Sequence, residues 1–300
     1  MLRLAARLLA TALLVTPAFA PAFADEIQLP TATGPVAVAA NPAKVAVLDI
    51  AAIDTLDALG VTPAGTPDNL YVPYLASLSG KALPVGTLFE PDLEALAALA
   101  PDLIIAGGRS STQVEPLSAV ATTVDMTIWE DIPAEGRARI EAYGALFGKQ
   151  AEAASLTADW DAKFAEAKAA IAGKGRALIV MTNGPKVAAY GKGSRFGWLH
   201  TALDLPEAHE NLNPETHGDA ISFEFIAEVN PDWLIVVDRA SAIGEAGSAQ
   251  ATLDNALVKG TTAGQKGQII YLDSAPIYIA GGGFRSMMGT LDQLIAAFGT

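Results

Sequence analysis

The sequence contains no cysteine and only three histidines among 300 residues. The absence of cysteine excludes disulfide bonds, thiolate metal sites and cysteine nucleophiles. The histidines, His200, His209 and His217, are not paired at the spacing of a metal site, and no loop is rich in histidine. These features argue against a protein that binds zinc or manganese ions directly.

Positive charge is scarce as well, with 19 Lys and Arg against 33 Asp and Glu and a formal net charge of -14. A chain this acidic is poorly suited to binding nucleic acid or an anionic membrane surface. Any anionic ligand must therefore be held by a local cluster of cations. A hydrophobic content of 51% with 17% charged residues is typical of a globular protein, and the length allows two domains.

The common catalytic and nucleotide-binding motifs are missing from the sequence. It has no G-x-S-x-G elbow, no P-loop and no dinucleotide fingerprint. An enzyme that uses Ser194 or the glycine turn at residues 281–283 is the remaining alternative of that class. We therefore predict a binding protein without enzymatic activity and without a tightly bound cofactor.

Only the N-terminus carries a sustained apolar run outside the predicted helices and strands. Two arginines in residues 1–7 precede an apolar stretch, residues 8–15, which is too short to span a bilayer. Small-x-small cleavage patterns follow at residues 18–20 and 22–24. These features predict a secretory signal peptide, residues 1–24, cut after Ala24. No cysteine follows the apolar run, so we expect an exported, soluble protein without a lipid anchor.

One pattern occurs twice, at residues 94–109 (EALAALAPDLIIAGGR) and 224–239 (EFIAEVNPDWLIVVDR). In each copy a Glu precedes Pro-Asp by seven residues, an apolar run follows, and an Arg lies eight residues after the Pro. The pattern predicts a short helix ended by Pro, then a buried parallel strand, residues 103–106 or 234–237. Pro-Asp before an apolar run is also typical of any buried strand, but that leaves the repeated Arg unexplained.

The repeated arginines, Arg109 and Arg239, lie just past the carboxyl ends of their predicted strands. Ligands of open α/β sheets bind at that edge. Two copies with one Arg each predict two similar lobes that present cations to a shared cleft. Only seven arginines remain after residue 24, so composition alone does not account for two of them at the same position of a repeat.

A long uninterrupted helix is predicted between the two repeats. Residues 150–172 contain neither Gly nor Pro, and their apolar side chains form one stripe at Leu156, Trp160, Phe164, Ala167 and Ile171. Such a helix would be about 35 Å long. We therefore predict an α/β fold with two Rossmann-like lobes, residues 25–148 and 174–300, joined by a single long helix within residues 149–173, with the ligand cleft between the lobes.

Three segments of the second lobe carry further candidate residues. A glycine-rich turn, residues 191–195, precedes a predicted helix and ends in Arg195, and free backbone N–H groups at such a turn suit an anion. His217 lies in a polar loop, residues 211–220. Tyr278 lies in a predicted loop, residues 273–283, and Ser286 is expected to cap the final helix. Taken singly, each of these side chains is more typical of a surface or packing position.

Five segments resemble a known family: DLIIAGGR (102–109), GSRFG (193–197), THG (216–218), VVDR (236–239) and LDSAPIY (272–278). With the signal peptide and the bridging helix, they resemble class III substrate-binding proteins of ABC importers, and in particular the enterochelin/petrobactin-type ferric-siderophore-binding proteins. The resemblance spans roughly residue 45 to the C-terminus. Some members are lipoproteins, whereas this chain is expected to be soluble in the periplasm and monomeric.

The resemblance implies a role for each candidate residue. Arg109, Arg195 and Arg239 would hold an anionic catecholate siderophore, whose oxygens suit the planar guanidinium fork. His217 and Tyr278 would complete the coordination of ferric iron when the siderophore supplies only four donors. The iron would thus arrive as part of the siderophore complex.

The same resemblance implies that two glutamates dock the protein on its partner. Glu94 and Glu224 would meet arginines of an ABC importer permease, which receives the siderophore. The alternative is that both are solvated acids at helix starts, where they favour the helix dipole. For the ligand itself, the alternatives on this fold are haem, cobalamin or a free metal ion.

Overall fold

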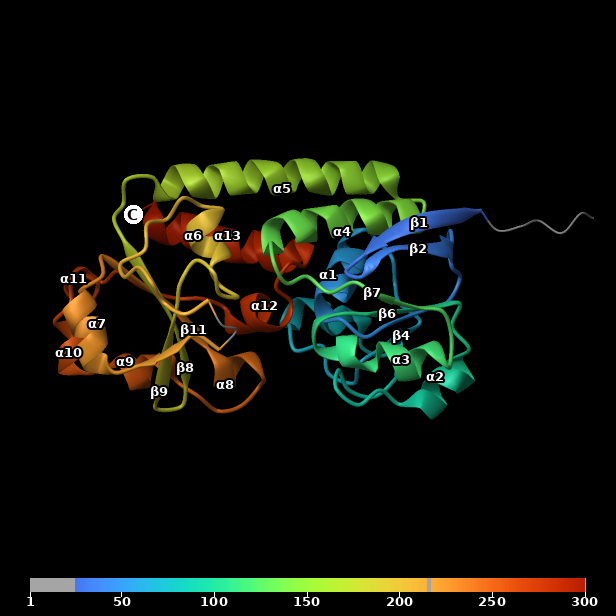
Figure 1. The fold of residues 1–300 in the computed structure, drawn as a ribbon, viewed down its shortest axis with the longest axis horizontal. Coiled ribbons are helices and arrows are strands. Elements are labelled where there is room, and N and C mark those ends of the chain that lie inside the picture. Colours follow the sequence, from blue (N-terminus) through green and yellow to red (C-terminus); the bar gives the residue numbers. More distant parts are fainter. Residues whose placement is uncertain (1–24, 215–216, 300) are drawn as a thin grey trace, which may run out of the picture.

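The computed structural model describes residues 25–214 and 217–299, which form two α/β lobes along the long axis of the molecule (Figure 1). Helix α5 (Gln150–Ile171) extends along both lobes. The predicted α/β fold with two lobes and a long bridging helix is confirmed. The predicted signal peptide, residues 1–24, lies outside the described residues. Within the described part of the chain, no helix is long and apolar enough to cross a membrane.

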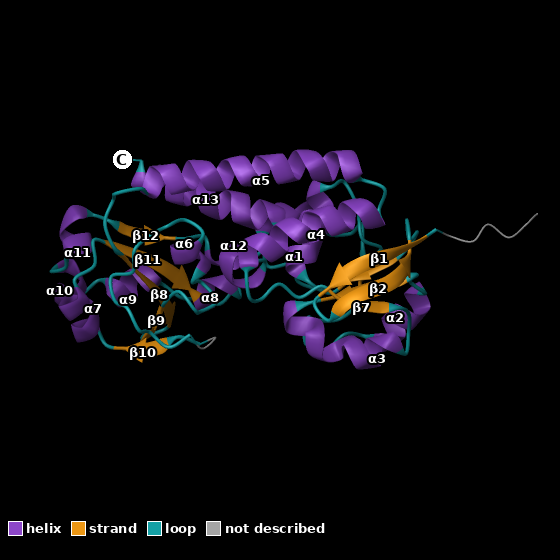
Figure 2. Ribbon diagram, turned by 45° about the horizontal axis from the view of Figure 1, so that its top comes forward, coloured by secondary structure: helices purple, strands orange, loops and turns teal. Residues whose placement is uncertain are grey.

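The first lobe is built on a parallel sheet in the order β5-β4-β3-β6-β7, beside a two-stranded hairpin. Its elements are β1 (Glu26–Thr31), β2 (Gly34–Ala39), β3 (Val45–Val47), α1 (Ile50–Ala58), β4 (Gly65–Thr66), η1 (Pro73–Leu78), β5 (Leu83–Pro84), α2 (Leu93–Leu99), β6 (Leu103–Ala106), η2 (Gly108–Gln113), α3 (Val114–Ser118), β7 (Thr123–Asp125) and α4 (Ile132–Leu146). Helices cover this sheet (Figure 2), which is why the neighbouring strands β3 and β6 are apolar throughout.

The second lobe has a sheet in the order β10-β9-β8-β11-β12, in which β8, β11 and β12 are parallel and β9 and β10 antiparallel. Its elements are β8 (Ala177–Asn183), β9 (Lys186–Tyr190), α6 (Trp198–Thr201), β10 (Asp219–Ile221), α7 (Phe223–Val229), β11 (Trp233–Asp238), α8 (Arg239–Ala242), α9 (Ala249–Leu253), α10 (Ala256–Lys259), α11 (Thr262–Lys266), β12 (Ile269–Tyr271), α12 (Ser274–Ile279) and α13 (Phe284–Phe298).

The two repeats fold alike. Each begins with a short helix, α2 or α7, whose start is capped by a side chain, Asp92 or Ser222. Each helix ends in a left-handed residue immediately before the Pro, Ala100 (φ 48°) or Asn230 (φ 44°). The predicted strands are confirmed as β6 and β11, which have equivalent places inside their sheets.

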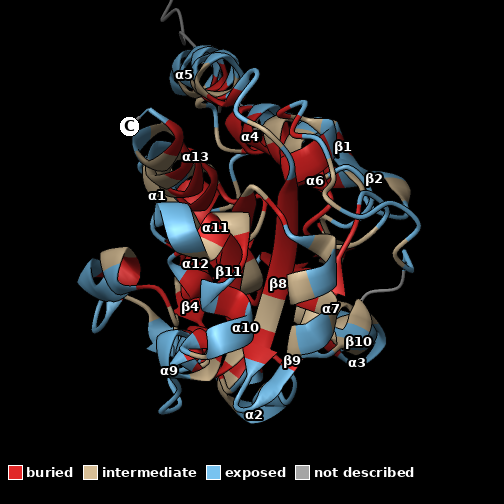
Figure 3. Ribbon diagram, turned by 90° about the vertical axis from the view of Figure 1, so that its left-hand side faces the viewer, coloured by how far each residue is buried: buried red, intermediate tan, exposed pale blue. Residues whose placement is uncertain are grey.

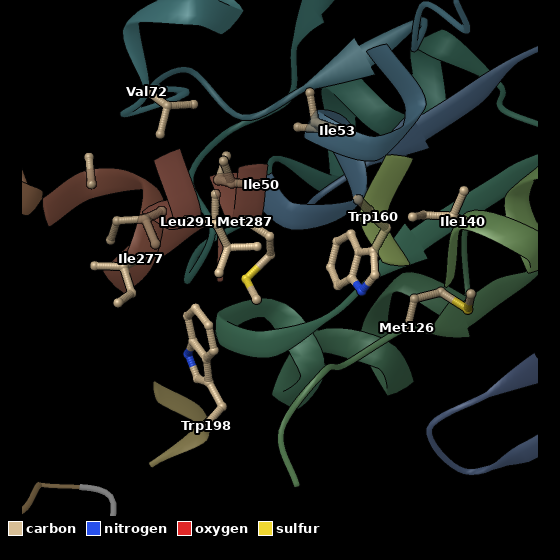
Figure 4. Packing of buried hydrophobic residues seen from close by; sticks show 14 of the residues in the cluster. Ile50, Ile53, Val72, Met126, Ile140, Trp160, Trp198, Ile277, Met287 and Leu291 are labelled. Carbon is tan, nitrogen blue, oxygen red and sulfur yellow. The ribbon is translucent and has the colours of Figure 1, made fainter. Parts of the chain in front are cut away.

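One apolar core continues through both lobes. It joins side chains of α1 and the first sheet to side chains of α5, α6, α12, α13 and the second sheet. Figure 4 shows Ile50 of α1 near Met287 and Leu291 of α13. The predicted stripe of α5 faces this core, and the buried regions in Figure 3 run along α13 and the central strands. The lobes are therefore packed together rather than merely tethered.

The start of α13 is held by the first lobe. Asp54 of α1 accepts hydrogen bonds from the backbone N–H of Arg285 (2.6 Å) and Ser286 (2.9 Å) and from the hydroxyl of Tyr74 (2.6 Å). Burial raises the pKa of Asp54 to about 6, although these donors favour its charged form. The expectation that Ser286 caps the final helix is wrong, because its hydroxyl donates to the Pro276 carbonyl instead (2.7 Å).

The predicted loop at residues 273–283 is also wrong in part, because residues 274–279 form helix α12. Pro276 misled the prediction, since proline usually interrupts helices. Here it occupies the third helical position, where a backbone N–H has no partner within the helix. Tyr278 therefore projects from a short helix, between the two lobes.

Candidate ligand-binding cleft

Two adjoining pockets lie between the lobes. The first holds about 950 Å³ of empty space, counted out to its open mouth, and is lined by Asp49, Ala51, Phe89, Gly108, Arg109, Ile128, Trp129, Ile132, Arg195, Ile277, Tyr278, Ile279 and Gly281. The second shares Trp129, Ile132 and Arg195 with the first and continues along the glycine-rich turn before α6. Together they form one interlobe cleft with cationic, aromatic and aliphatic walls.

Arg109 reaches across this cleft from the first lobe. Its position is set by the turn after β6, where Gly108 has φ 52° and its N–H donates to Thr127 Oγ1 (2.9 Å). The guanidinium donates through Nη2 to the Tyr278 carbonyl (2.9 Å) and through Nη1 to the Ile279 carbonyl (3.5 Å). These carbonyls lie at the end of α12, where they have no partner within the helix.

Arg195 approaches Tyr278 from the second lobe. The turn that carries it is closed by Ser194 Oγ, which donates to the Gly191 carbonyl (2.7 Å). The Arg195 guanidinium donates to the Tyr278 carbonyl (2.9 Å) and lies over the Tyr278 ring, 4.3 Å from its centroid. The corresponding distance from Arg109 is 5.0 Å. Two cations thus lie against the same aromatic ring.

Arg239 influences Tyr278 but is not among the residues that line either cleft pocket. It begins α8, and the preceding Asp238 caps that helix by accepting from the N–H of Ala240 (3.1 Å) and also binds the N–H of Ala249 (2.8 Å). Burial by itself would raise the pKa of Tyr278. The charge of Arg195, a hydrogen bond from Arg239 and the charge of Arg109 outweigh burial and bring that pKa below its usual value.

The remaining predicted site residues lie elsewhere. His217 is exposed and is not among the residues that line either cleft pocket. Glu94 and Glu224 are exposed in the first turns of α2 and α7, which are equivalent places in the two repeats. In the described part of the chain, no group of three or more His, Cys, Asp or Glu side chains is arranged to hold a metal ion.

Three cleft residues were missed by the sequence analysis. Asp49 lies two residues after the end of β3 and caps α1 by accepting from the Ala52 N–H (3.2 Å), and burial raises its pKa to about 6. Its position between a strand and a helix could have been used to predict that Asp49 lies at the cleft, because ligands bind at the carboxyl ends of such strands. Phe89 and Trp129 are exposed at the cleft, and nothing in the sequence distinguishes them from packing aromatics.

Comparisons with known proteins agree with this architecture. The petrobactin-binding protein YclQ of Bacillus subtilis is 36% identical over 259 residues, which cover 85% of this chain and 82% of that protein. Its crystal structure superposes with a TM-score of 0.86, at 33% identity over 92% of this chain and 99% of that chain. The ferric-anguibactin-binding protein FatB of Vibrio anguillarum is 30% identical over 277 residues, 88% of this chain and 85% of that protein.

A third relative is known by its structure. The periplasmic catecholate-siderophore binding protein VctP of Vibrio cholerae superposes with a TM-score of 0.82, at 29% identity over 91% of this chain and 99% of that chain. The sequence profile described as periplasmic binding protein matches residues 45–276. These relatives are binding proteins and not enzymes, as predicted. The chain belongs to the periplasmic binding protein family.

Proposed function

We propose that this protein captures an anionic ferric siderophore of the catecholate type and delivers it to an ABC importer. The observation that carries the proposal is the meeting of Arg109 and Arg195 at Tyr278 in the interlobe cleft, with Arg239 adding positive charge near the same side chain. Each guanidinium has five N–H donors in a planar fork. The Tyr278 and Ile279 carbonyls use two donors of Arg109, and the Tyr278 carbonyl uses one donor of Arg195, so further donors can serve ligand oxygens.

The relatives support this class of ligand over the alternatives. Petrobactin, anguibactin and a catecholate siderophore appear in the names of three proteins that cover most of this chain. Haem, cobalamin and free metal ions appear in none of those names. A cationic cleft in a chain of net charge -14 is a local positive focus, which suits a chelate with net negative charge.

Tyr278 is the proposed iron ligand contributed by the protein. Ferric iron favours hard, anionic oxygen donors, and the surrounding arginines lower the pKa of the Tyr278 phenol toward the phenolate form. His217 is proposed as the second ligand. A siderophore with four donors leaves two positions on an octahedral ferric ion, which these two side chains would fill. The iron is cargo, and no resident cofactor is proposed.

The remaining proposals concern export and partners. Residues 1–24 would be removed on export, residues 25–148 and 174–300 would be the two lobes, and the soluble mature protein would act as a monomer in the periplasm. Glu94 and Glu224, exposed on equivalent helices, would meet cationic residues of the importer permease. Arginine–carboxylate pairs of this kind suit a reversible encounter.

Titration of the protein from residue 25 onward tests the proposed ligand class. The probes are the ferric complex of a bis-catecholamide, ferric citrate, haemin and cobalamin, with binding measured by calorimetry. The ferric bis-catecholamide should bind most tightly and show a protein-dependent shift of its charge-transfer band. Tighter binding of haemin or cobalamin would contradict the proposal and favour the alternative ligand class.

A further inference from the structure

Two large aromatic side chains are exposed at the cleft. The described chain has five exposed large hydrophobic side chains: Leu83, Phe89, Leu93, Trp129 and Leu257. Scattered exposed hydrophobics are ordinary and need no function. The three leucines lie outside both cleft pockets. The two aromatic residues, Phe89 (58% exposed) and Trp129 (52% exposed), both line the first pocket.

The segment that carries Trp129 is fixed from both sides by α4. Glu135 accepts hydrogen bonds from the backbone N–H of Trp129 (2.7 Å), Glu130 (3.1 Å) and Asp131 (3.1 Å). The buried Arg139 donates to the carbonyls of Met126 and Thr127 just before it, both at 3.2 Å, and to that of Pro30 (2.8 Å). Five hydrogen bonds to two side chains therefore fix the backbone that carries Trp129, and the sixth connects Arg139 to β1.

Phe89 is presented on a tight turn. The Thr87 hydroxyl accepts from the N–H of Phe89 (3.3 Å) and of Glu90 (2.9 Å). Gly86, with φ 88°, begins the turn, and a side chain there would lie 2.5 Å from the Asp92 nitrogen. Both aromatic residues are thus ordered at the cleft by their local backbone rather than by packing of their rings.

The same pocket is also lined by cationic side chains. Arg109, Arg195 and Tyr278 line it together with the two aromatics. A catecholate has the matching chemistry, because it joins a flat apolar ring to two adjacent anionic oxygens. Its oxygens suit the guanidinium groups, and its ring suits an aromatic face at contact distance. An aliphatic chelate such as ferric citrate offers the oxygens without the ring.

We propose that Phe89 and Trp129 form an aromatic wall that packs against the catechol rings of the ligand and sets a preference for aromatic over aliphatic ferric chelates. The inference rests on the proposed function and adds to it the residues that determine specificity. The arginines supply attraction for any anionic chelate, whereas the wall discriminates between chelates of similar charge.

Substitutions at Trp129 separate stacking from bulk. Trp129→Phe keeps an aromatic face, Trp129→Leu keeps apolar volume without one, and Trp129→Ala removes both. With ferric bis-catecholamide in calorimetry, we expect Trp129→Phe to bind within about threefold of wild type, and Trp129→Leu and Trp129→Ala to bind about tenfold more weakly, which equals about 1.4 kcal/mol. Leu257→Ala, at an exposed leucine outside the cleft, should bind like wild type.

Fluorescence gives a second measurement that does not depend on affinity. Trp160, Trp198 and Trp233 are buried, so collisional quenching by acrylamide reports mainly on Trp129. The gallium(III) complex of the same bis-catecholamide avoids charge-transfer absorption. Saturation with it should shield Trp129 and lower the quenching constant in wild type, and should leave that constant nearly unchanged in Trp129→Phe.

The outcomes distinguish this inference from the function on which it rests. Full affinity in Trp129→Leu or Trp129→Ala, or unchanged acrylamide quenching in the saturated wild type, would overturn the aromatic wall alone. Failure of wild type to bind any catecholate chelate would overturn the proposed function and the wall with it. Circular dichroism of each variant confirms that a loss of binding is not a loss of fold.

Discussion

Arg109 and Arg195 donate to the same atom, the carbonyl oxygen of Tyr278, each at 2.9 Å. One arginine comes from each lobe, so this carbonyl joins the two halves of the cleft. The end of α12 tolerates two cations because its last carbonyls lack partners within the helix and carry partial negative charge. Arg109 and Arg195, which we propose bind the ligand, are thus ordered by the protein backbone.

Removal of any one cleft arginine should weaken binding of the anionic chelate. A hydrogen bond to a charged group contributes on the order of 1.5–3 kcal/mol, so Arg109→Ala, Arg195→Ala and Arg239→Ala should each raise the Kd about tenfold or more. Arg137→Ala is the matched control, because Arg137 is paired with Asp161 on an outer helix face. A cleft variant that binds as tightly as Arg137→Ala would remove that arginine from the site.

The proposed iron ligands can be tested by absorption. The double variant His217→Ala with Tyr278→Phe should weaken a tetradentate ferric chelate by more than about tenfold and shift its charge-transfer band. A hexadentate chelate fills all six positions itself, so its affinity should change little. If the band of the tetradentate complex stays where it is, neither side chain binds the iron.

The exposed glutamates can be separated from the ligand site. Glu94→Ala with Glu224→Ala should abolish siderophore uptake in cells and leave the Kd for the chelate unchanged, because both side chains lie outside the cleft pockets. Glu90→Ala with Glu228→Ala is a control that removes the same charge nearby. Normal uptake by the first double variant would show that Glu94 and Glu224 do not dock the protein on the permease and act only as acids at helix starts.

Asp49 should make stability depend on pH in an identifiable direction. Its pKa is raised by burial to about 6 in the folded protein, against an unfolded value of 3.8, so the folded state binds its proton more tightly. Its contribution to stability is therefore lost as pH rises from about 4 to about 6. Asp49→Asn removes this titration and keeps a capping oxygen. The free energy of unfolding of the variant minus that of wild type, measured by urea unfolding, should therefore increase by on the order of 3 kcal/mol between pH 4 and pH 7. A difference that does not vary with pH would contradict this assignment.

The cap of α13 should be worth more than an ordinary helix cap. Asp54→Ala leaves the buried N–H of Ser286, the partly buried N–H of Arg285 and the Tyr74 hydroxyl without their acceptor, at a cost of about 3 kcal/mol or more. Asp92→Ala removes the exposed cap of α2 and should cost only about 1 kcal/mol. Similar losses in the two variants would show that the interlobe cap adds nothing beyond local helix capping.

The parts of this fold that sequence predicted are those set by local chemistry. The Glu, Pro-Asp and apolar run of each repeat act within one helix and one strand, so β6 and β11 follow from them directly. The apolar stripe of α5 is local as well. Arg109 could be placed at the cleft because strand ends in parallel sheets share an edge.

The features that sequence missed depend on distant partners. Asp54 caps a helix that begins about 230 residues later, which no window of sequence reveals. Tyr278 was assigned to a loop because Pro276 outweighed the helical context of its neighbours. The exposure of Phe89 and Trp129 is decided by the backbone of their turns, which holds apolar rings in the cleft against their usual tendency to be buried.

The cap on α13 also constrains the order in which the chain folds. Asp54 and Tyr74 belong to the first part of the chain to be synthesised or exported. Asp54 can accept from Tyr74 at that stage, but its other two hydrogen bonds form only when Arg285 and Ser286 are present. Contacts of such long sequence separation form slowly, because the intervening chain must first be closed into a loop. The N-terminal half should therefore stay incompletely folded, and open to proteases and chaperones, until the last helix has emerged.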